Sequence, residues 1–271
     1  MLILLLLIIQ LISYIYALPV VLMHGILSNK NTMNELKEYL ETTFSLNVIV
    51  PEIGNGFINS VNIPLNKQGD MLCEELNNNI QLIKGFNYIG MSQGGILGRY
   101  YIETCGIIPI NNFITLVSPH GGVYNNILYG INMYNKWVQK HYSFSSHWRD
   151  PYNYNKYTDT ALLAELNNEN ISNHTKNLIN KERFSKLNNF IMTYSPFDKV
   201  LSPPESGKFS TYNINSFDVV PLDKSIIYNN LGLNEMNNTG RLHVYTTTCG
   251  HDEHNNKKCF IQLYEMFKRF L

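Results

Sequence analysis

The chain is 271 residues long, which suits one large domain with a well-buried core better than two independent domains. Lysine plus arginine and aspartate plus glutamate number 21 each, so the formal net charge is zero. A neutral chain lacks the strong positive field that attracts nucleic acid, and we therefore expect no nucleic-acid partner.

The first segment, Met1 to Ala17, is almost continuously apolar. It is shorter than the roughly 20 residues that a membrane-spanning helix needs. It ends in Ile15-Tyr16-Ala17, a tolerable small-residue cleavage site, so we predict a signal peptide over residues 1–17. An uncleaved signal anchor is the alternative, because no basic residue precedes the apolar run. No second apolar run approaches membrane length, and we expect no stable membrane span in the mature chain.

Cysteines and asparagine motifs point to one compartment. The four cysteines are an even number, as expected for disulfide pairing in an oxidising environment. Three N-glycosylation sequons start at Asn170, Asn173 and Asn237. Each sequon alone means little in an asparagine-rich chain. Together with the leader and the cysteines, they predict entry into the secretory pathway.

Strands and helices alternate along the first half of the mature chain. Pro19 to Met23 is a short apolar run that reads as a buried strand, and Asn31 to Phe44 has the apolar spacing of a helix. Strand, helix, strand, helix and strand then follow over residues 46–50, 64–84, 86–90, 93–105 and 113–117. The alternation predicts a mostly parallel sheet, flanked by helices, with right-handed crossovers.

This alternation stops after Pro119. Residues from His120 to Leu187 are rich in asparagine and aromatic side chains, with helical patches, and indicate an inserted helical lid over about residues 120–187. Strands are expected again over residues 190–194 and 242–247, before an amphipathic helix over 259–271. No linker divides the chain, so residues 18–271 are predicted to form a single domain.

The motif Gly90-Met91-Ser92-Gln93-Gly94 matches G-x-S-x-G, the nucleophile turn of α/β-hydrolases. A predicted strand enters the motif and a predicted helix leaves it, so the chain must turn sharply at Ser92. Such a turn strains the serine backbone and requires glycine two residues before and after it. We therefore predict an α/β-hydrolase fold with Ser92 as the nucleophile. An idle serine in a glycine-rich turn is the alternative.

A serine nucleophile needs a base, which in this fold lies in the loop after a late strand. His251 follows the predicted strand 242–247 through Cys249-Gly250 and is the favoured base. His254 lies in the same loop but nearer to the last helix, where we expect it to be solvated. His243 lies inside the strand.

The orienting acid is expected between the nucleophile and the base along the chain. Asp198 directly follows the predicted strand 190–194 and is favoured. Asp218 is the rival, with Asp223 behind it. Asp198 could instead be a turn residue whose side chain bonds to its own backbone.

The oxyanion hole of this fold uses two backbone amides. One comes from the residue after the nucleophile, which is Gln93. The other comes from the loop after the first strand, which assigns the amide of Ile26. His24 in the same loop is expected to be structural. No Cys/His group has zinc-ligand spacing, and a serine hydrolase requires no nucleotide, so no metal or other cofactor is predicted.

Several segments together resemble the palmitoyl-protein thioesterase family. They occur in the family's order from about Pro19 to the C-terminus: Val21-Leu22-Met23-His24-Gly25, Pro51-Glu52-Ile53-Gly54, Gly90-Met91-Ser92-Gln93-Gly94-Gly95, His120-Gly121-Gly122-Val123 and Leu231-Gly232-Leu233-Asn234-Glu235-Met236. The resemblance implies an α/β-hydrolase with a helical insertion that removes long acyl chains from cysteine thioesters of proteins, usually in the lysosome. The partners would be S-acylated proteins or peptides, and we expect a monomer that is lysosomal or secreted.

By position, the resemblance also assigns Ser92, Asp198 and His251 as the triad, and Ile26 and Gln93 as the oxyanion residues. Cys73 and Cys105 stand where the family has a disulfide. The lid departs from the family because it is rich in asparagine and lacks the extra lid cysteines of some members. Cys249 and Cys259 flank His251 and could form a second bridge.

Two other functions stay open. An oxygen-ester lipase or carboxylesterase of the same fold would use the same triad. An inactive hydrolase-fold binding protein is a more remote alternative, since Ser92, Asp198 and His251 are all present. Both tryptophans, Trp137 and Trp148, lie in the insertion with many tyrosines, where they could line an acyl groove or form the lid's own core.

Overall fold

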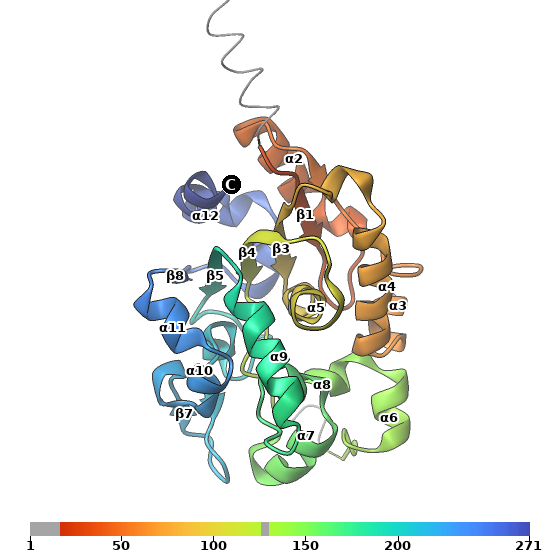
Figure 1. Cartoon of the computed structure of the whole chain (residues 1–271), viewed down its shortest axis with the longest axis vertical. Coiled ribbons are helices and arrows are strands. Elements are labelled where there is room, and N and C mark those ends of the chain that lie inside the picture. The colour runs from red at the N-terminus through yellow and green to blue at the C-terminus, as the bar shows by residue number, and fades with distance from the viewer. Residues whose placement is uncertain (1–16, 126–129) are drawn as a thin grey trace, which may run out of the picture.

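The computed structural model describes residues 17–125 and 130–271, so the predicted signal peptide, except Ala17, lies outside the described residues. Within the described chain a six-stranded sheet has the order β2-β1-β3-β4-β5-β8, and every neighbouring pair is parallel (Figure 1). This confirms the predicted parallel sheet. Its strands are β1 (Val20–Met23), β2 (Val48–Ile49), β3 (Phe86–Met91), β4 (Ile110–Leu116), β5 (Asn189–Tyr194) and β8 (Leu242–Thr246).

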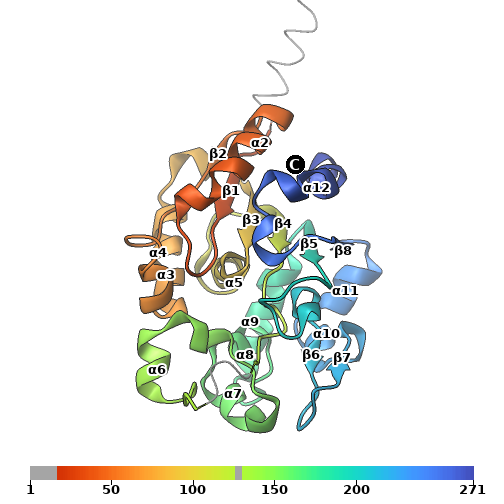
Figure 2. The ribbon, with the colours of Figure 1, turned by 180° about the vertical axis from the view of Figure 1, so that it is seen from behind.

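Helices cover both faces of the sheet, so apolar residues on both sides of its central strands are buried. One face packs against α4 (Leu65–Asn77), α5 (Gln93–Tyr100), α9 (His174–Ser185) and α11 (Leu233–Asn238). The other face packs against α2 (Asn34–Phe44) and α12 (Lys257–Phe270), as the two opposite views show (Figures 1 and 2). All residues of β1 and β3 are buried between these layers.

Two predicted elements are shorter than expected, and a third changes its helix type. The helix predicted over residues 64–84 ends at Asn77, and a separate 3₁₀ turn (Ile80–Leu82) begins where the Asn79 side chain caps the amide of Gln81. The strand predicted over 46–50 has two residues, because β2 is an edge strand that pairs only with β1. The helix predicted over 93–105 is α-helical to Tyr100 and continues as one π-helical turn.

Short helices fill the segment between β4 and β5. They are α6 (Lys136–His141), α7 (Tyr154–Thr160) and α8 (Leu162–Leu166), followed by α9. In both views α6, α7 and α8 gather at the end of the molecule opposite α2 and α12, whereas α9 runs along the body beside α5 (Figures 1 and 2). Phe184 of α9 accordingly packs edge-on against Phe190 of β5.

The segment from β5 to β8 holds elements that the sequence did not reveal. They are the antiparallel pair β6 (Thr211–Tyr212) and β7 (Val219–Val220), and the helix α10 (Ile226–Asn230) before α11. A four-residue helix, α3 (Asn59–Asn62), precedes α4. Among residues 17–125 and 130–271 we find no helix with the length and apolar character to cross a bilayer.

Candidate active site

Ser92 stands at the sharp turn between β3 and α5. Its backbone has φ 52° and ψ −123°, a conformation that side-chain-bearing residues rarely adopt. A Cβ at Gly90 would lie 2.5 Å from the amide nitrogen of Gly95, and one at Gly94 would lie 2.5 Å from the Met23 carbonyl oxygen. The glycines of the motif are therefore required by the close packing of β3, α5 and β1.

The structure brings Ser92, Asp198 and His251 together. Along the chain, His251 lies 53 residues from Asp198 and 159 residues from Ser92. The Nε2 atom of His251 lies 2.9 Å from Ser92 Oγ, and its Nδ1 atom lies 2.6 Å from Asp198 Oδ2. All three side chains are buried, which strengthens each charge-assisted contact by excluding water. The arrangement can take a proton from the serine hydroxyl and hold the resulting imidazolium.

Asp198 is held as a carboxylate by the turn that follows β5. Its Oδ1 atom accepts hydrogen bonds from the amides of Val200 at 2.8 Å and Leu201 at 3.0 Å. Burial raises the pKa of the Asp198 carboxyl, but the hydrogen bond and charge of His251, together with the two amides, outweigh burial and leave the pKa below its usual value. The carboxylate is therefore ionised at neutral pH.

The rival residues lie elsewhere. Asp218 is exposed in the turn between β6 and β7, where it accepts a hydrogen bond from Ser216, and Asp223 is exposed beside Lys224. His243 contacts Asn189 on the sheet. The expectation that His254 is solvated is wrong, because the His254 side chain is fully buried. Its ring nitrogens contact Thr247 Oγ1 at 2.8 Å and the Gly250 carbonyl oxygen at 2.9 Å.

The loop after β1 lies against Ser92. A Cβ at Gly25 would be 3.0 Å from Ser92 Cβ and 3.6 Å from Ser92 Oγ, so the loop that carries Ile26 passes directly beside the hydroxyl. Gln93 is the first residue of α5, where the unpaired amides of a helix N-terminus point outward. His24 is buried under this loop, with Nε2 3.3 Å from Glu52 Oε1, as its expected structural role requires.

A buried amide network supports Gln93 and was not anticipated from the sequence. The Gln93 Nε2 atom donates to the Ser60 carbonyl at 3.0 Å and to Gln68 Oε1 at 3.2 Å. Gln68 Nε2 donates to the carbonyls of Ser60 and Ile63, and Ser143 Oγ donates to the Ser60 carbonyl at 2.7 Å. The available signal was a glutamine within the apolar stripe of α4, where a buried polar residue needs partners.

Two disulfides flank the site. Cys249 is joined to Cys259 across the loop that holds His251, and Cys73 of α4 is joined to Cys105, which ends the turn after α5. Among the sequon asparagines, Asn173 and Asn237 are exposed, whereas the Asn170 side chain is partly buried and donates to the Thr158 carbonyl. The Cys249–Cys259 pair therefore closes the loop that carries His251, and the Cys73–Cys105 pair ties α4 to the helical turn that follows α5.

The chain is similar over most of its length to palmitoyl-protein thioesterases. A family model described as palmitoyl protein thioesterase matches residues 19–251. Palmitoyl-protein thioesterase 3 of Dictyostelium discoideum is 36% identical over 250 residues, covering 87% of this chain and 86% of the relative. Lysosomal thioesterase PPT2-B of Xenopus laevis is 30% identical over 247 residues, covering 84% of each.

Solved structures share the fold at low identity. Bacillus licheniformis lipase BlEst2 matches with a TM-score of 0.55 at 14% identity, over 93% of this chain and 50% of the lipase. A bromoperoxidase from Bacillus anthracis matches with a TM-score of 0.52 at 13% identity, over 93% of this chain and 92% of the other. The family match spans most of the sequence and the described sheet is the one the resemblance implied, so the chain is an enzyme of the palmitoyl protein thioesterase family with the α/β-hydrolase fold.

Proposed function

We propose that the chain hydrolyses long-chain acyl thioesters on protein cysteines, with Ser92, His251 and Asp198 as its catalytic triad. The observation that carries the proposal is the hydrogen-bonded series Ser92–His251–Asp198 in a chain of this family. The names of the relatives, palmitoyl-protein thioesterase and lysosomal thioesterase, supply the substrate class.

The proposed reaction has two acyl-transfer steps. His251 takes the proton of Ser92 as the hydroxyl oxygen attacks the thioester carbonyl, and the amides of Ile26 and Gln93 hold the oxyanion. The carbon–sulfur bond then breaks, the cysteine sulfur takes the proton from His251, and the acyl group stays on Ser92. A water molecule, deprotonated by His251, attacks this ester, and His251 returns the proton to the Ser92 oxygen as the fatty acid leaves. Asp198 keeps the imidazole in the required tautomer throughout.

We further propose that residues of the predicted insertion, about 120–187, form a lid over the site. Support comes from buried contacts between this segment and the nucleophile helix. Arg99 of α5 is fully buried and donates to Asn167 Oδ1 at 2.7 Å and to the Leu166 carbonyl at 2.6 Å. Asn167 in turn donates to the His120 carbonyl. These contacts fix the end of α8 to the helix that starts at Ser92.

Buried polar contacts around Glu169 connect parts of the proposed lid to one another. Arg149 contacts Glu169 Oε1 at 2.9 Å, and Tyr157 donates to Glu169 Oε2 at 2.6 Å. Trp148 is buried while Trp137 is exposed, so the two tryptophans have different environments. We propose that Trp148 belongs to the lid's core and that Trp137 is available to contact an acyl chain or its carrier.

The proposed location is the secretory pathway, either the lysosome or the outside of the cell. Relatives from Xenopus laevis and Homo sapiens carry the name lysosomal thioesterase, and the two disulfides fit an oxidising compartment. The proposed partners are S-acylated proteins and peptides, acted on by a monomer. The sequon asparagines 170, 173 and 237 are proposed as glycosylation sites.

Two measurements test the proposal. Purified enzyme is compared on palmitoyl-CoA and on a matched palmitate oxygen ester; faster turnover of the thioester is expected, and near-zero thioester turnover would reject the function in favour of an oxygen-ester hydrolase. A fluorophosphonate probe should label the wild-type chain and not Ser92→Ala. Equal labelling of both would refute Ser92 as the nucleophile.

A further inference from the structure

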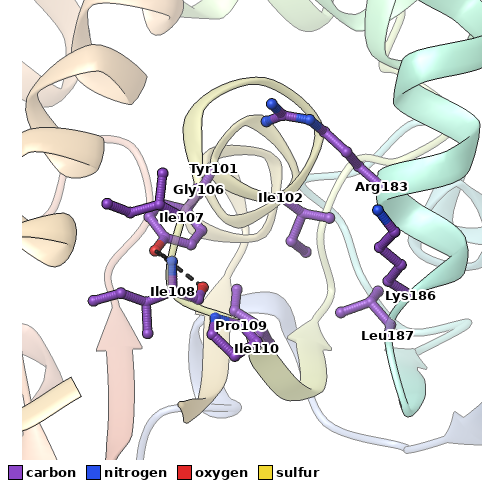
Figure 3. Close-up of a pocket in the computed structure, with 10 residues that line it drawn as sticks. All are labelled: Tyr101, Ile102, Gly106, Ile107, Ile108, Pro109, Ile110, Arg183, Lys186 and Leu187. Atoms are coloured by element: carbon purple, nitrogen blue, oxygen red, sulfur yellow. Dashed lines mark hydrogen bonds between the residues drawn. The ribbon is translucent and has the colours of Figure 1, made fainter. Parts of the chain in front are cut away.

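A cavity lies at the amino-terminal edge of the sheet, whereas Ser92 follows the carboxyl end of β3. It has a volume of about 310 Å³ and opens to solvent between the start of β4 and the end of α9 (Figure 3). Its apolar walls include Ile102, Ile107, Ile108, Ile110 and Leu187. Ligand pockets begin at roughly this size and are mostly apolar with few polar groups. None of the proposed triad residues lines it.

The polar groups of this cavity are cationic. Arg183 and Lys186 stand on the α9 side, across from Ile107 and Ile108, and no aspartate or glutamate among the described residues lines the cavity (Figure 3). The hydroxyl of Tyr101 is already engaged with Asn77 and with the main chain of Ile108. The charged side chains that line the cavity are therefore Arg183 and Lys186, and Glu182 pairs with Lys186 from outside the lining.

Arg183 has a buried nitrogen without an acceptor. Its Nη1 atom is shielded from solvent, and within the described residues it has no hydrogen-bond partner. A guanidinium is always charged and carries five donors, so burying one without an acceptor is unfavourable. Lys186 forms an exposed ion pair with Glu182 at 2.9 Å, and such surface pairs contribute little to stability. Both cations can accept a new anionic partner.

The helix end near the cavity does not repel an anion. The carboxyl end of a helix carries partial negative charge on its unpaired carbonyls. Here Arg241 Nη1 donates to the carbonyls of Ser185 at 2.7 Å and Leu187 at 2.9 Å, which satisfies these carbonyls and adds a third positive charge. The field at the cavity mouth is therefore positive despite the helix terminus.

We propose that this cavity binds the carboxylate end of a fatty acid, with Arg183 and Lys186 holding the anion and the isoleucines covering the first methylenes. A guanidinium pairs bidentately with a carboxylate, and burial of each methylene adds a favourable hydrophobic contribution. The choice of a fatty acid over another amphiphilic anion rests on the proposed function, which releases such an acid. The small volume also favours a carboxylate over a bulkier headgroup.

The test is a titration of the mature chain, labelled with ¹³C at isoleucine methyl groups, with decanoate, decyl phosphate and decyltrimethylammonium. Decanoate should shift the methyl signals of Ile107 and Ile108 saturably. Arg183→Gln should weaken its binding by about tenfold or more, since a charged hydrogen bond is lost. Ile107→Asp, at a position that is 78% exposed, should also weaken it by adding a negative charge. Arg269→Gln, exposed on α12 across the sheet, is the matched control and should not change it.

The outcomes separate the cavity from catalysis. Titrations repeated in the Ser92→Ala background report on the cavity whether or not the proposed reaction is correct. Absence of shifts at Ile107 and Ile108, equal binding of decyltrimethylammonium, or unchanged binding in both Arg183→Gln and Ile107→Asp would overturn the proposal. Binding of decyl phosphate without decanoate would also overturn it, in favour of a phosphate ligand.

Discussion

The side-chain amide of Gln93 donates to the main-chain carbonyl of Ser60 at 3.0 Å, across 33 residues of chain. The same carbonyl accepts hydrogen bonds from Gln68 and from Ser143 of the proposed lid. One buried oxygen thus joins the residue after the proposed nucleophile to α3, α4 and the lid. These hydrogen bonds hold the Gln93 side chain in place and thereby fix its backbone amide, the proposed oxyanion donor.

Replacing Gln68 should therefore impair both stability and catalysis. Gln68→Leu removes the Gln68 donor from the Ile63 carbonyl and the Gln68 Oε1 acceptor from Gln93, which should lower the free energy of unfolding by about 1–3 kcal/mol. If Gln68 positions Gln93, kcat should fall while KM stays nearly constant, because the oxyanion contact forms only in the transition state. Lys67→Ala, an exposed neighbour paired with Asp70 on the surface, is the control and should change neither. An unchanged kcat in Gln68→Leu would limit Gln68 to a structural role.

Asp198 and Asp218 should respond differently to the same substitution. Asp198→Asn removes the charge that orients His251, so turnover should fall by roughly 10⁴-fold with little effect on folding. Asp218→Asn changes an exposed turn and should leave turnover within twofold of the wild type, by the scale of surface substitutions. Steady-state kinetics on palmitoyl-CoA measures both. The opposite ranking would move the acid to Asp218.

His147 should make stability depend on pH. Burial lowers the pKa of His147 to about 4, from an unfolded value of 6.5. The unfolded chain therefore binds more protons between pH 4 and 6.5, and the contribution of His147 is full above pH 6.5 and lost as the pH falls toward 4, by up to about 3 kcal/mol.

Denaturant unfolding of wild type and His147→Gln across this pH range measures the effect. The stability of His147→Gln should fall less on acidification than that of the wild type. His141→Gln, an exposed histidine of the same segment, should follow the wild-type curve. Parallel curves for wild type and His147→Gln would contradict the buried neutral state.

Gly94 should tolerate no side chain, whereas Gly250, next to His251, should. A Cβ at Gly94 would lie 2.5 Å from the Met23 carbonyl and 2.6 Å from the His24 carbonyl, so Gly94→Ala must displace the loop that carries Ile26. Gly250 has φ −66°, and a Cβ there would lie 3.4 Å from its nearest neighbour, Glu253 Oε2. The added methyl group of Gly250→Ala therefore makes ordinary contacts. Gly94→Ala should lose most activity and Gly250→Ala should keep it. Full fluorophosphonate labelling of Gly94→Ala would show that the turn is less tightly packed than described.

The features that the sequence predicted correctly depend on residues close together along the chain. Short stretches of residues predicted the alternation of strands and helices, the turn at Ser92 and the loops that carry Asp198 and His251. This was possible because periodicity and glycine requirements depend on neighbours along the chain. The family resemblance, confirmed by the match over residues 19–251, extended this reading to the substrate class. The pairing of β6 with β7 could not be read, because two-residue strands leave no period to detect.

By itself the sequence determined the parallel sheet and the chemical kinds of residue available at its carboxyl edge. Only the tertiary structure decided that His254 is buried against Thr247 and that Gln68 and Ser60 meet Gln93. It also left Arg183 with a buried nitrogen that has no acceptor among the described residues. The physical reason is that hydrogen bonds between distant segments depend on which faces the packed layers bring together, and no local pattern records that choice.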